Sequence, residues 1–122
     1  MKSFLLVFLG GGLGSAIRYL VASAMNQYSK FLPFGTITVN ILGCLLIGMI
    51  LGYAQRENTL TSNQTLLLAT GFCGGFTTFS AFANENLELI KNGEIFNFSV
   101  YTIGSILVGV LAVFIGFYLT NR

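Results

Sequence analysis

Long runs of apolar residues separated by short polar segments dominate the chain. The runs cover residues 3–25, 34–54, 65–90 and 97–120, and most of the charged residues stand between them. Each run has about 20 residues or more, and about 20 residues of α-helix cross the roughly 30 Å hydrocarbon layer of a bilayer. The pattern therefore predicts an all-α membrane protein with four transmembrane helices.

Composition agrees with this interpretation and excludes a soluble domain. Of the 122 residues, 54% are hydrophobic and 8% are charged, whereas a soluble chain of this length carries charge over most of its surface. The connections at residues 26–33, 55–64 and 91–96 are short and polar, so consecutive helices are expected to run antiparallel. We expect a single integral membrane domain over residues 1–122.

The N-terminal sequence MKSFLLVFLGGGLGSA resembles a signal peptide, with a basic start, an apolar stretch and small residues near a possible cleavage point. However, Arg18 and Tyr19 follow at once, and the apolar pattern then continues to Met25. We therefore predict that this segment is the first transmembrane helix.

Basic residues outside the apolar runs are almost evenly divided between the two predicted sides of the membrane. Lys2, Arg56 and Arg122 fall on one side, and Lys30 and Lys91 on the other. Orientation follows the excess of positive charge in short loops, so this difference favours neither direction strongly. A chain that inserts both ways can pair with an inverted copy of itself. The charge pattern therefore predicts an antiparallel, dual-topology homodimer.

The third run contains an interruption, GFCGGFTTFSAF at residues 71–82. The pair Gly74-Gly75 lowers helix propensity, and non-helical backbone at mid-membrane depth survives only inside protein or beside a water-filled cavity. We expect the third helix to be broken at this pair. In an inverted dimer, two such breaks could meet at the symmetry axis and offer carbonyl oxygens to a cation.

Two phenylalanines follow this interruption at helical spacing. Phe79 and Phe82 share one face of the helix that follows it, which is typical of core packing. The edge of an aromatic ring also carries partial positive charge, so the same two rings could contact an anion in a pore. Spacing alone favours core packing over contact with an anion.

Uncharged polar residues recur inside the spans, where burying them in lipid is costly. A single hydroxyl can bond to its own helix, and an Asn can join two helices, but donors in several spans together favour a polar path. The second run carries Thr36, Thr38 and Asn40, and the fourth carries Tyr101, Thr102 and Ser105. Two further polar positions within the spans are the charged residues Arg18 and Glu85.

Other functional classes fit less well. The chain has no histidine, and Cys44 and Cys73 stand alone within apolar runs, so neither a metal site nor a redox or hydrolytic enzyme is indicated. A small multidrug transporter needs a proton-coupling carboxylate, ordinarily in its first helix, and here only Glu85 lies near a span centre. A structural assembly subunit would explain the glycine pairs but not the polar residues.

Three segments, GGGLGSAIRY at 10–19, GTITVNILG at 35–43 and the stretch at 71–82, resemble the signatures of the Fluc/CrcB family of fluoride channels. The resemblance spans the chain. It implies a dual-topology dimer with two antiparallel pores in a bacterial plasma membrane. It also implies that the dimer is no enzyme and exports fluoride passively from the cytoplasm, which lowers fluoride toxicity.

The resemblance also assigns roles to individual residues. It implies that Phe79 and Phe82 contact fluoride beside the Asn40 amide. It implies that the backbone carbonyls of Gly74 and Thr77 hold a structural Na⁺ at the dimer interface. The remaining residues would form a polar track, namely Thr36, Ser80, Tyr101 and Ser105, with Arg18 and Glu85 toward the pore ends.

Two positions depart from the family pattern. Ala81 stands where the family often has Thr, and Gly109 stands where some relatives have Ser. The expected hydroxyl track is therefore thinner here, which bears on conduction rate more than on the choice of ion.

Overall fold

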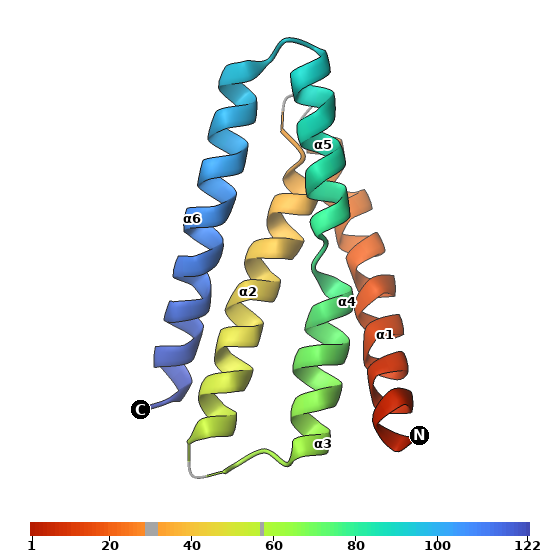
Figure 1. Ribbon diagram of the computed structural model, residues 1–122, viewed down its shortest axis with the longest axis vertical. Coiled ribbons are helices and arrows are strands. Elements are labelled where there is room, and N and C mark those ends of the chain that lie inside the picture. Colours follow the sequence, from red (N-terminus) through yellow and green to blue (C-terminus); the bar gives the residue numbers. More distant parts are fainter. Residues whose placement is uncertain (29–31, 57) are drawn as a thin grey trace.

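The computed structural model describes residues 1–28, 32–56 and 58–122 and forms a bundle of long helices (Figure 1). Lys30, one of the loop charges behind the orientation prediction, lies outside the described residues. Consecutive long helices run in opposite directions, and both chain termini lie at the same end of the bundle. The prediction of four helices long and apolar enough to span a membrane is confirmed.

The third span is assembled from several helical segments, whereas the other three spans are continuous. It begins three residues earlier than expected because Thr61 and Gln64 form a capping box at its start. The elements are α1 (Lys2–Met25), the 3₁₀-helix η1 (Asn26–Tyr28), α2 (Phe34–Gln55), α3 (Ser62–Thr65), the π-helix η2 (Leu66–Cys73), α4 (Gly74–Phe76), α5 (Phe79–Lys91) and α6 (Ile95–Thr120).

The third helix opens at Thr77 and Thr78, so the expectation of a break at Gly74-Gly75 is wrong. Thr77 (φ −86°, ψ 158°) and Thr78 (φ −148°, ψ 118°) are extended, while Gly74 (φ −61°, ψ −38°) is helical. β-branched residues adopt extended backbone readily, and Thr78 also caps α5 through its hydroxyl. Gly75 serves a different purpose, because a Cβ there would overlap the carbonyl oxygen of Gly11 in α1.

Glycines set the distance between packed helices. A Cβ on Gly48 would overlap the Val113 carbonyl oxygen of α6, and one on Gly116 would overlap the Leu45 carbonyl oxygen of α2. The same relation joins α1 to the third span, where a Cβ on Gly14 would overlap the Phe72 carbonyl oxygen. These small residues allow backbone-to-backbone contact between transmembrane helices.

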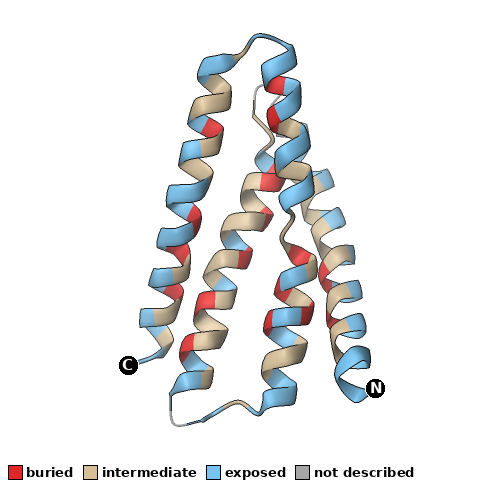
Figure 2. Ribbon diagram, viewed as in Figure 1, coloured by how far each residue is buried: buried red, intermediate tan, exposed pale blue. Residues whose placement is uncertain are grey.

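Buried residues lie on the inward faces of the helices (Figure 2), and many large apolar side chains are exposed on the outer surface. Large exposed side chains such as Phe8 on α1 and Leu107 and Phe114 on α6 belong to this outer surface. A bilayer solvates such a surface, whereas water does not. The bundle is therefore a multi-pass membrane protein.

Candidate functional site

The site is built around the two extended residues of the third span. Where the helix ends, the Cys73 carbonyl accepts hydrogen bonds from the Thr77 backbone N–H (3.0 Å) and the Thr77 hydroxyl (2.9 Å). One residue later, the Thr78 hydroxyl accepts a hydrogen bond from the Ala81 backbone N–H (3.2 Å) and so starts α5. Local side chains therefore form one hydrogen bond at each of the two helix ends that the break creates.

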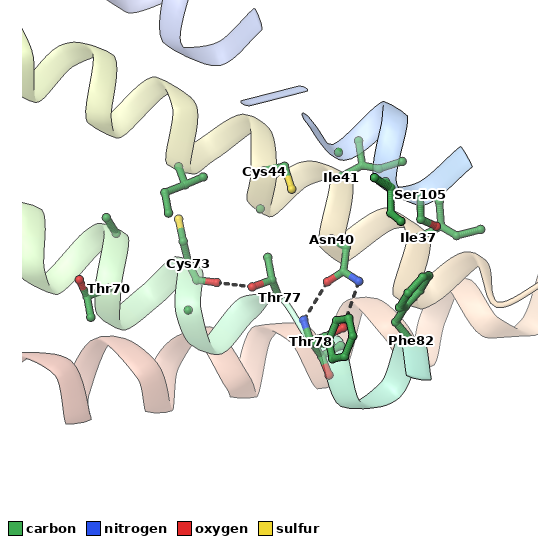
Figure 3. Close-up of a pocket in the computed structure, with 17 residues that line it drawn as sticks. Ile37, Asn40, Ile41, Cys44, Thr70, Cys73, Thr77, Thr78, Phe82 and Ser105 are labelled. Carbon is green, nitrogen blue, oxygen red and sulfur yellow. Dashed lines mark hydrogen bonds between the residues drawn. The ribbon is translucent and has the colours of Figure 1, made fainter. Parts of the chain in front are cut away.

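Asn40 in the middle of α2 fastens the break to the neighbouring helix. Its Oδ1 accepts a hydrogen bond from the Thr78 N–H (2.8 Å), and its Nδ2 donates one to the Thr78 carbonyl (3.1 Å) (Figure 3). The amide thus pairs with Thr78 as a neighbouring backbone would. An amide nitrogen carries two N–H groups, and one of them is free of this pairing.

Two backbone carbonyls at the break lack their usual helical donors. In a continuous helix, the N–H groups of Thr78 and Ala81 would serve the carbonyls of Gly74 and Thr77. Here those N–H groups donate to Asn40 and to the Thr78 hydroxyl instead. No other hydrogen bond among the described residues ends on either carbonyl. Both carbonyls belong to residues that line the same cavity.

That cavity, of about 560 Å³, lies where α2, the third span and α6 meet. Its lining is predominantly apolar and includes no Asp, Glu, Lys or Arg among the described residues. Of the site residues predicted from the sequence, it brings together Asn40, Gly74, Thr77, Phe79, Phe82 and Ser105.

The two phenylalanines are exposed to different degrees. Phe79 is 79% exposed in the single chain, and Phe82 is half-buried. Their ring centroids lie 5.8 Å apart, and that of Phe82 lies 5.0 Å from the Tyr101 ring. A line of rings therefore runs from the cavity toward α6.

A second cluster surrounds the carboxylate of Glu85, one turn beyond the phenylalanines. The Thr36 hydroxyl donates to Glu85 Oε2 (2.7 Å), and the Tyr101 hydroxyl donates to Oε1 (2.8 Å). Thr36 and Tyr101 are buried, at 4% and 3% exposure, and Glu85 is half-buried. Three helices thus meet at one carboxylate, which keeps both of its oxygens hydrogen-bonded.

Arg18 and Ser80 lie outside the cavity lining. The Arg18 Nε–H donates to the Gly75 carbonyl (2.9 Å), beside the break, and the hydroxyl of Ser15 lies 3.4 Å from the same oxygen. Ser80 is exposed, and its hydroxyl lies 3.2 Å from that of Thr78.

Sequence reasoning missed one buried polar residue. Asn86 is 8% exposed, and its Oδ1 accepts a hydrogen bond from the Thr102 hydroxyl (3.1 Å), which joins α5 to α6. Its position after Glu85, on the strongly amphipathic helix α5, was the available signal. Within the described residues, no three His, Cys, Asp or Glu side chains group as a metal site.

Comparisons with known proteins identify the family of this chain. Residues 5–117 match the family described as "CrcB-like protein, Camphor Resistance (CrcB)". The chain is 47% identical to a protein of Phocaeicola vulgatus over 99% of this chain and 100% of the relative. It is 48% identical to one of Bacteroides fragilis (100% and 98%) and 41% identical to one of Flavobacterium psychrophilum (100% and 99%). All three relatives are named "Fluoride-specific ion channel FluC". With a matched segment that covers nearly the whole chain, this protein belongs to the CrcB-like family.

Proposed function

We propose that this protein is a fluoride-selective channel of the plasma membrane that lets fluoride leave the cytoplasm passively. The observation that carries the proposal is the cavity at the broken helix, where the amide of Asn40, the hydroxyl of Ser105 and the rings of Phe79 and Phe82 meet without a charged residue. The names of the relatives point to the same ion.

The chemistry of this lining suits a small, strongly hydrated anion. Such an ion enters only if close donors replace its water. The N–H of Asn40 that does not bond to Thr78 and the Ser105 hydroxyl are such donors. The ring edges of Phe79 and Phe82 carry partial positive charge and would add further favourable contacts with the anion along the cavity wall. A lysine or arginine at the narrowest point would hold fluoride too tightly for rapid release, and the described residues that line the cavity include neither.

Thr36 and Tyr101 continue the polar track beyond the rings. Both hydroxyls donate to Glu85, and fluoride, which is also an acceptor, would compete with the carboxylate for them. We assign Ser80, whose exposed hydroxyl adjoins that of Thr78, to the same track. In this proposal Glu85 lies at the end of the polar track, toward one end of the pore.

No energy source beyond the membrane potential is required. With the cell interior negative, each exported anion gains about 2.3 kcal/mol per 100 mV. The proposed function is therefore passive transport rather than catalysis, and its consequence is protection from fluoride that entered as neutral HF.

We further propose that two copies assemble antiparallel around a Na⁺ ion. The carbonyls of Gly74 and Thr77 lack helical donors, and carbonyl oxygens are ligands that suit a hard cation. One chain offers two such oxygens, so a second, inverted copy would double the set. A Cβ at Gly74 would meet nothing within 4 Å in the single chain, which leaves room there for an ion and a partner.

The test is a fluoride efflux assay. The purified protein is reconstituted in liposomes loaded with potassium fluoride, a K⁺ ionophore removes the potential that opposes efflux, and a fluoride electrode follows release. Rapid release of fluoride without chloride, slowed by Phe82→Ile, supports the proposal. Absence of release from folded protein, together with proton-coupled cation transport that Glu85→Gln abolishes, would instead indicate a small multidrug transporter.

A further inference from the structure

One cation inside a transmembrane helix has a backbone carbonyl, and no carboxylate, as its partner. Arg18 Nε donates to the Gly75 carbonyl at 2.9 Å, and its side chain is half-buried between α1 and the third span. The ion pair found among the described residues joins Lys91 and Glu88 on the exposed surface of α5. A guanidinium in the span costs desolvation energy, so its position at one carbonyl calls for a physical reason.

The Gly75 carbonyl needs this donor because the helix stops just after it. α4 ends at Phe76, and the carbonyls of a last helical turn have no intrahelical partner. Arg18 donates the hydrogen bond that the Gly75 carbonyl lacks within the helix. Ser15, three residues earlier and therefore on the same face of α1, adds a weaker contact at 3.4 Å. A positive charge also suits the negative end of the helix dipole.

A glycine contact fixes the same point from a second direction. A Cβ on Gly75 would overlap the Gly11 carbonyl oxygen and lie 2.9 Å from the Gly11 Cα. Arg18 follows Gly11 by seven residues, which is about two helical turns, so both contacts come from one stripe of α1. The end of α4 is thereby held against α1 in both position and rotation.

The residues that line the cavity come from α2, the third span and α6, and none comes from α1. Arg18 therefore touches the break from outside the cavity, while Thr77, Thr78 and Phe79, two to four residues after Gly75, line it. We propose that Arg18 is a positioning residue of the pore, which anchors the Gly75 carbonyl so that the extended residues and Phe79 keep their places. This inference rests on the channel function proposed above.

The test compares Arg18→Gln and Arg18→Lys in the fluoride efflux assay. We expect Arg18→Gln to lower the rate at least tenfold, because the shorter neutral amide does not hold the carbonyl. Arg18→Lys, which keeps a charged donor on a long side chain, should recover most of that loss. The matched control, Arg122→Gln, makes the same change on an exposed residue at the C-terminus and should leave the rate within twofold of wild type.

Ionic strength separates positioning from attraction of the anion by charge. Salt screens a charge that attracts fluoride from a distance, with a Debye length of about 10 Å at 0.1 M. The ratio of wild-type to Arg18→Gln rates should therefore stay constant between low and high potassium sulfate. A ratio that falls toward one as the salt rises would overturn the positioning role in favour of electrostatic attraction.

Solid-state NMR reads the contact itself, independently of transport. With ¹⁵N-arginine and glycine labelled with ¹³C at the carbonyl, we expect one close Nε-to-carbonyl dipolar coupling that Arg18→Gln removes. Absence of this coupling in the wild type would overturn the inference whatever the flux. If the wild type conducts fluoride and Arg18→Gln conducts it at the same rate, the positioning role of Arg18 is wrong while the channel proposal stands. If the folded wild type does not conduct fluoride, the channel proposal is wrong and this role with it.

Discussion

Asn40 and Thr78 exchange two hydrogen bonds across the interface between α2 and the broken helix, although 38 residues separate them in sequence. Through this pair, one side chain satisfies both backbone groups of an extended residue at mid-span. One N–H of the same amide takes no part in this pairing, and Asn40 lines the cavity. Asn40 therefore links the architecture of the break to the chemistry of the proposed pore.

Replacing Asn40 with Asp tests this link. The substitution keeps the size and the acceptor for the Thr78 N–H, but it places a carboxylate oxygen against the Thr78 carbonyl, which loses its donor. A buried polar group without its partner costs about 1–3 kcal/mol. We expect lower thermal stability of the purified protein and a fluoride efflux rate at least tenfold below that of wild type.

Asn84→Asp is the matched control, because Asn84 is exposed on α5 and the chemical change is the same. It should leave both stability and efflux close to wild type. Equal effects of the two substitutions would mean that added negative charge, and not the loss of the Thr78 contact, explains the Asn40 result.

Tyr101→Phe removes one donor from Glu85 and leaves the ring that packs 5.0 Å from Phe82. In the proposed track, fluoride also loses the hydrogen bond that the Tyr101 hydroxyl would donate to it. A hydrogen bond to a charged group is worth about 1.5–3 kcal/mol, and about 1.4 kcal/mol corresponds to a factor of ten in rate. We therefore expect the efflux rate to fall about tenfold while the protein stays folded. Tyr118→Phe, at an exposed position of α6, is the control and should have no effect. An unchanged rate in Tyr101→Phe would remove the hydroxyl from the proposed track.

Part of this architecture follows directly from the sequence. The four spans can be predicted because length and hydropathy are local properties, and their existence is confirmed. The proximity of Asn40, Phe79 and Phe82 was also accessible through the family resemblance, and all three line one cavity. The position of the break could not be predicted from the sequence, because a glycine pair is equally typical of a helix interruption and of close helix contact.

Contacts that depend on helix rotation lay beyond the reach of sequence patterns. Arg18 was expected toward a pore end, and its hydrogen bond to Gly75 spans 57 residues. Such a pairing depends on how α1 turns against the third span, and on the π-helix Leu66–Cys73, whose wider turns shift the register of all that follows. Neither feature leaves a periodic signal in the chain.

Gly48→Ala should destabilise the bundle, because its Cβ would overlap the Val113 carbonyl oxygen and lie 3.0 Å from the Phe117 nitrogen. Both are backbone atoms, so α2 and α6 must separate. Overpacking of this kind costs about 1–3 kcal/mol. Thermal unfolding in detergent, followed by circular dichroism, measures the loss. Gly104→Ala, whose Cβ would meet nothing within 4 Å, is the control, and equal melting temperatures in the two variants would contradict close backbone contact at Gly48.

Gly74→Ala separates effects within one chain from effects of a partner. Its Cβ would meet nothing within 4 Å, so the isolated fold should tolerate it, whereas Gly75→Ala would collide with Gly11 inside the chain. If Gly74 faces an ion and an inverted copy, as we propose, then Gly74→Ala should weaken the dimer and remove any Na⁺-dependent stabilisation. Gly75→Ala should instead lower the stability of the fold with or without Na⁺.

Single-molecule photobleaching in liposomes over a range of protein densities gives the dimer fraction. Thermal unfolding with and without Na⁺ shows whether Na⁺ binds the folded protein, because a ligand that binds only the folded state raises its stability as the ligand concentration rises. Gly12→Ala, also without neighbours within 4 Å but on α1, supplies the background for an added methyl group. A Gly74→Ala protein that dimerises like Gly12→Ala and retains a Na⁺ response equal to wild type would exclude Gly74 from both the interface and the ion site.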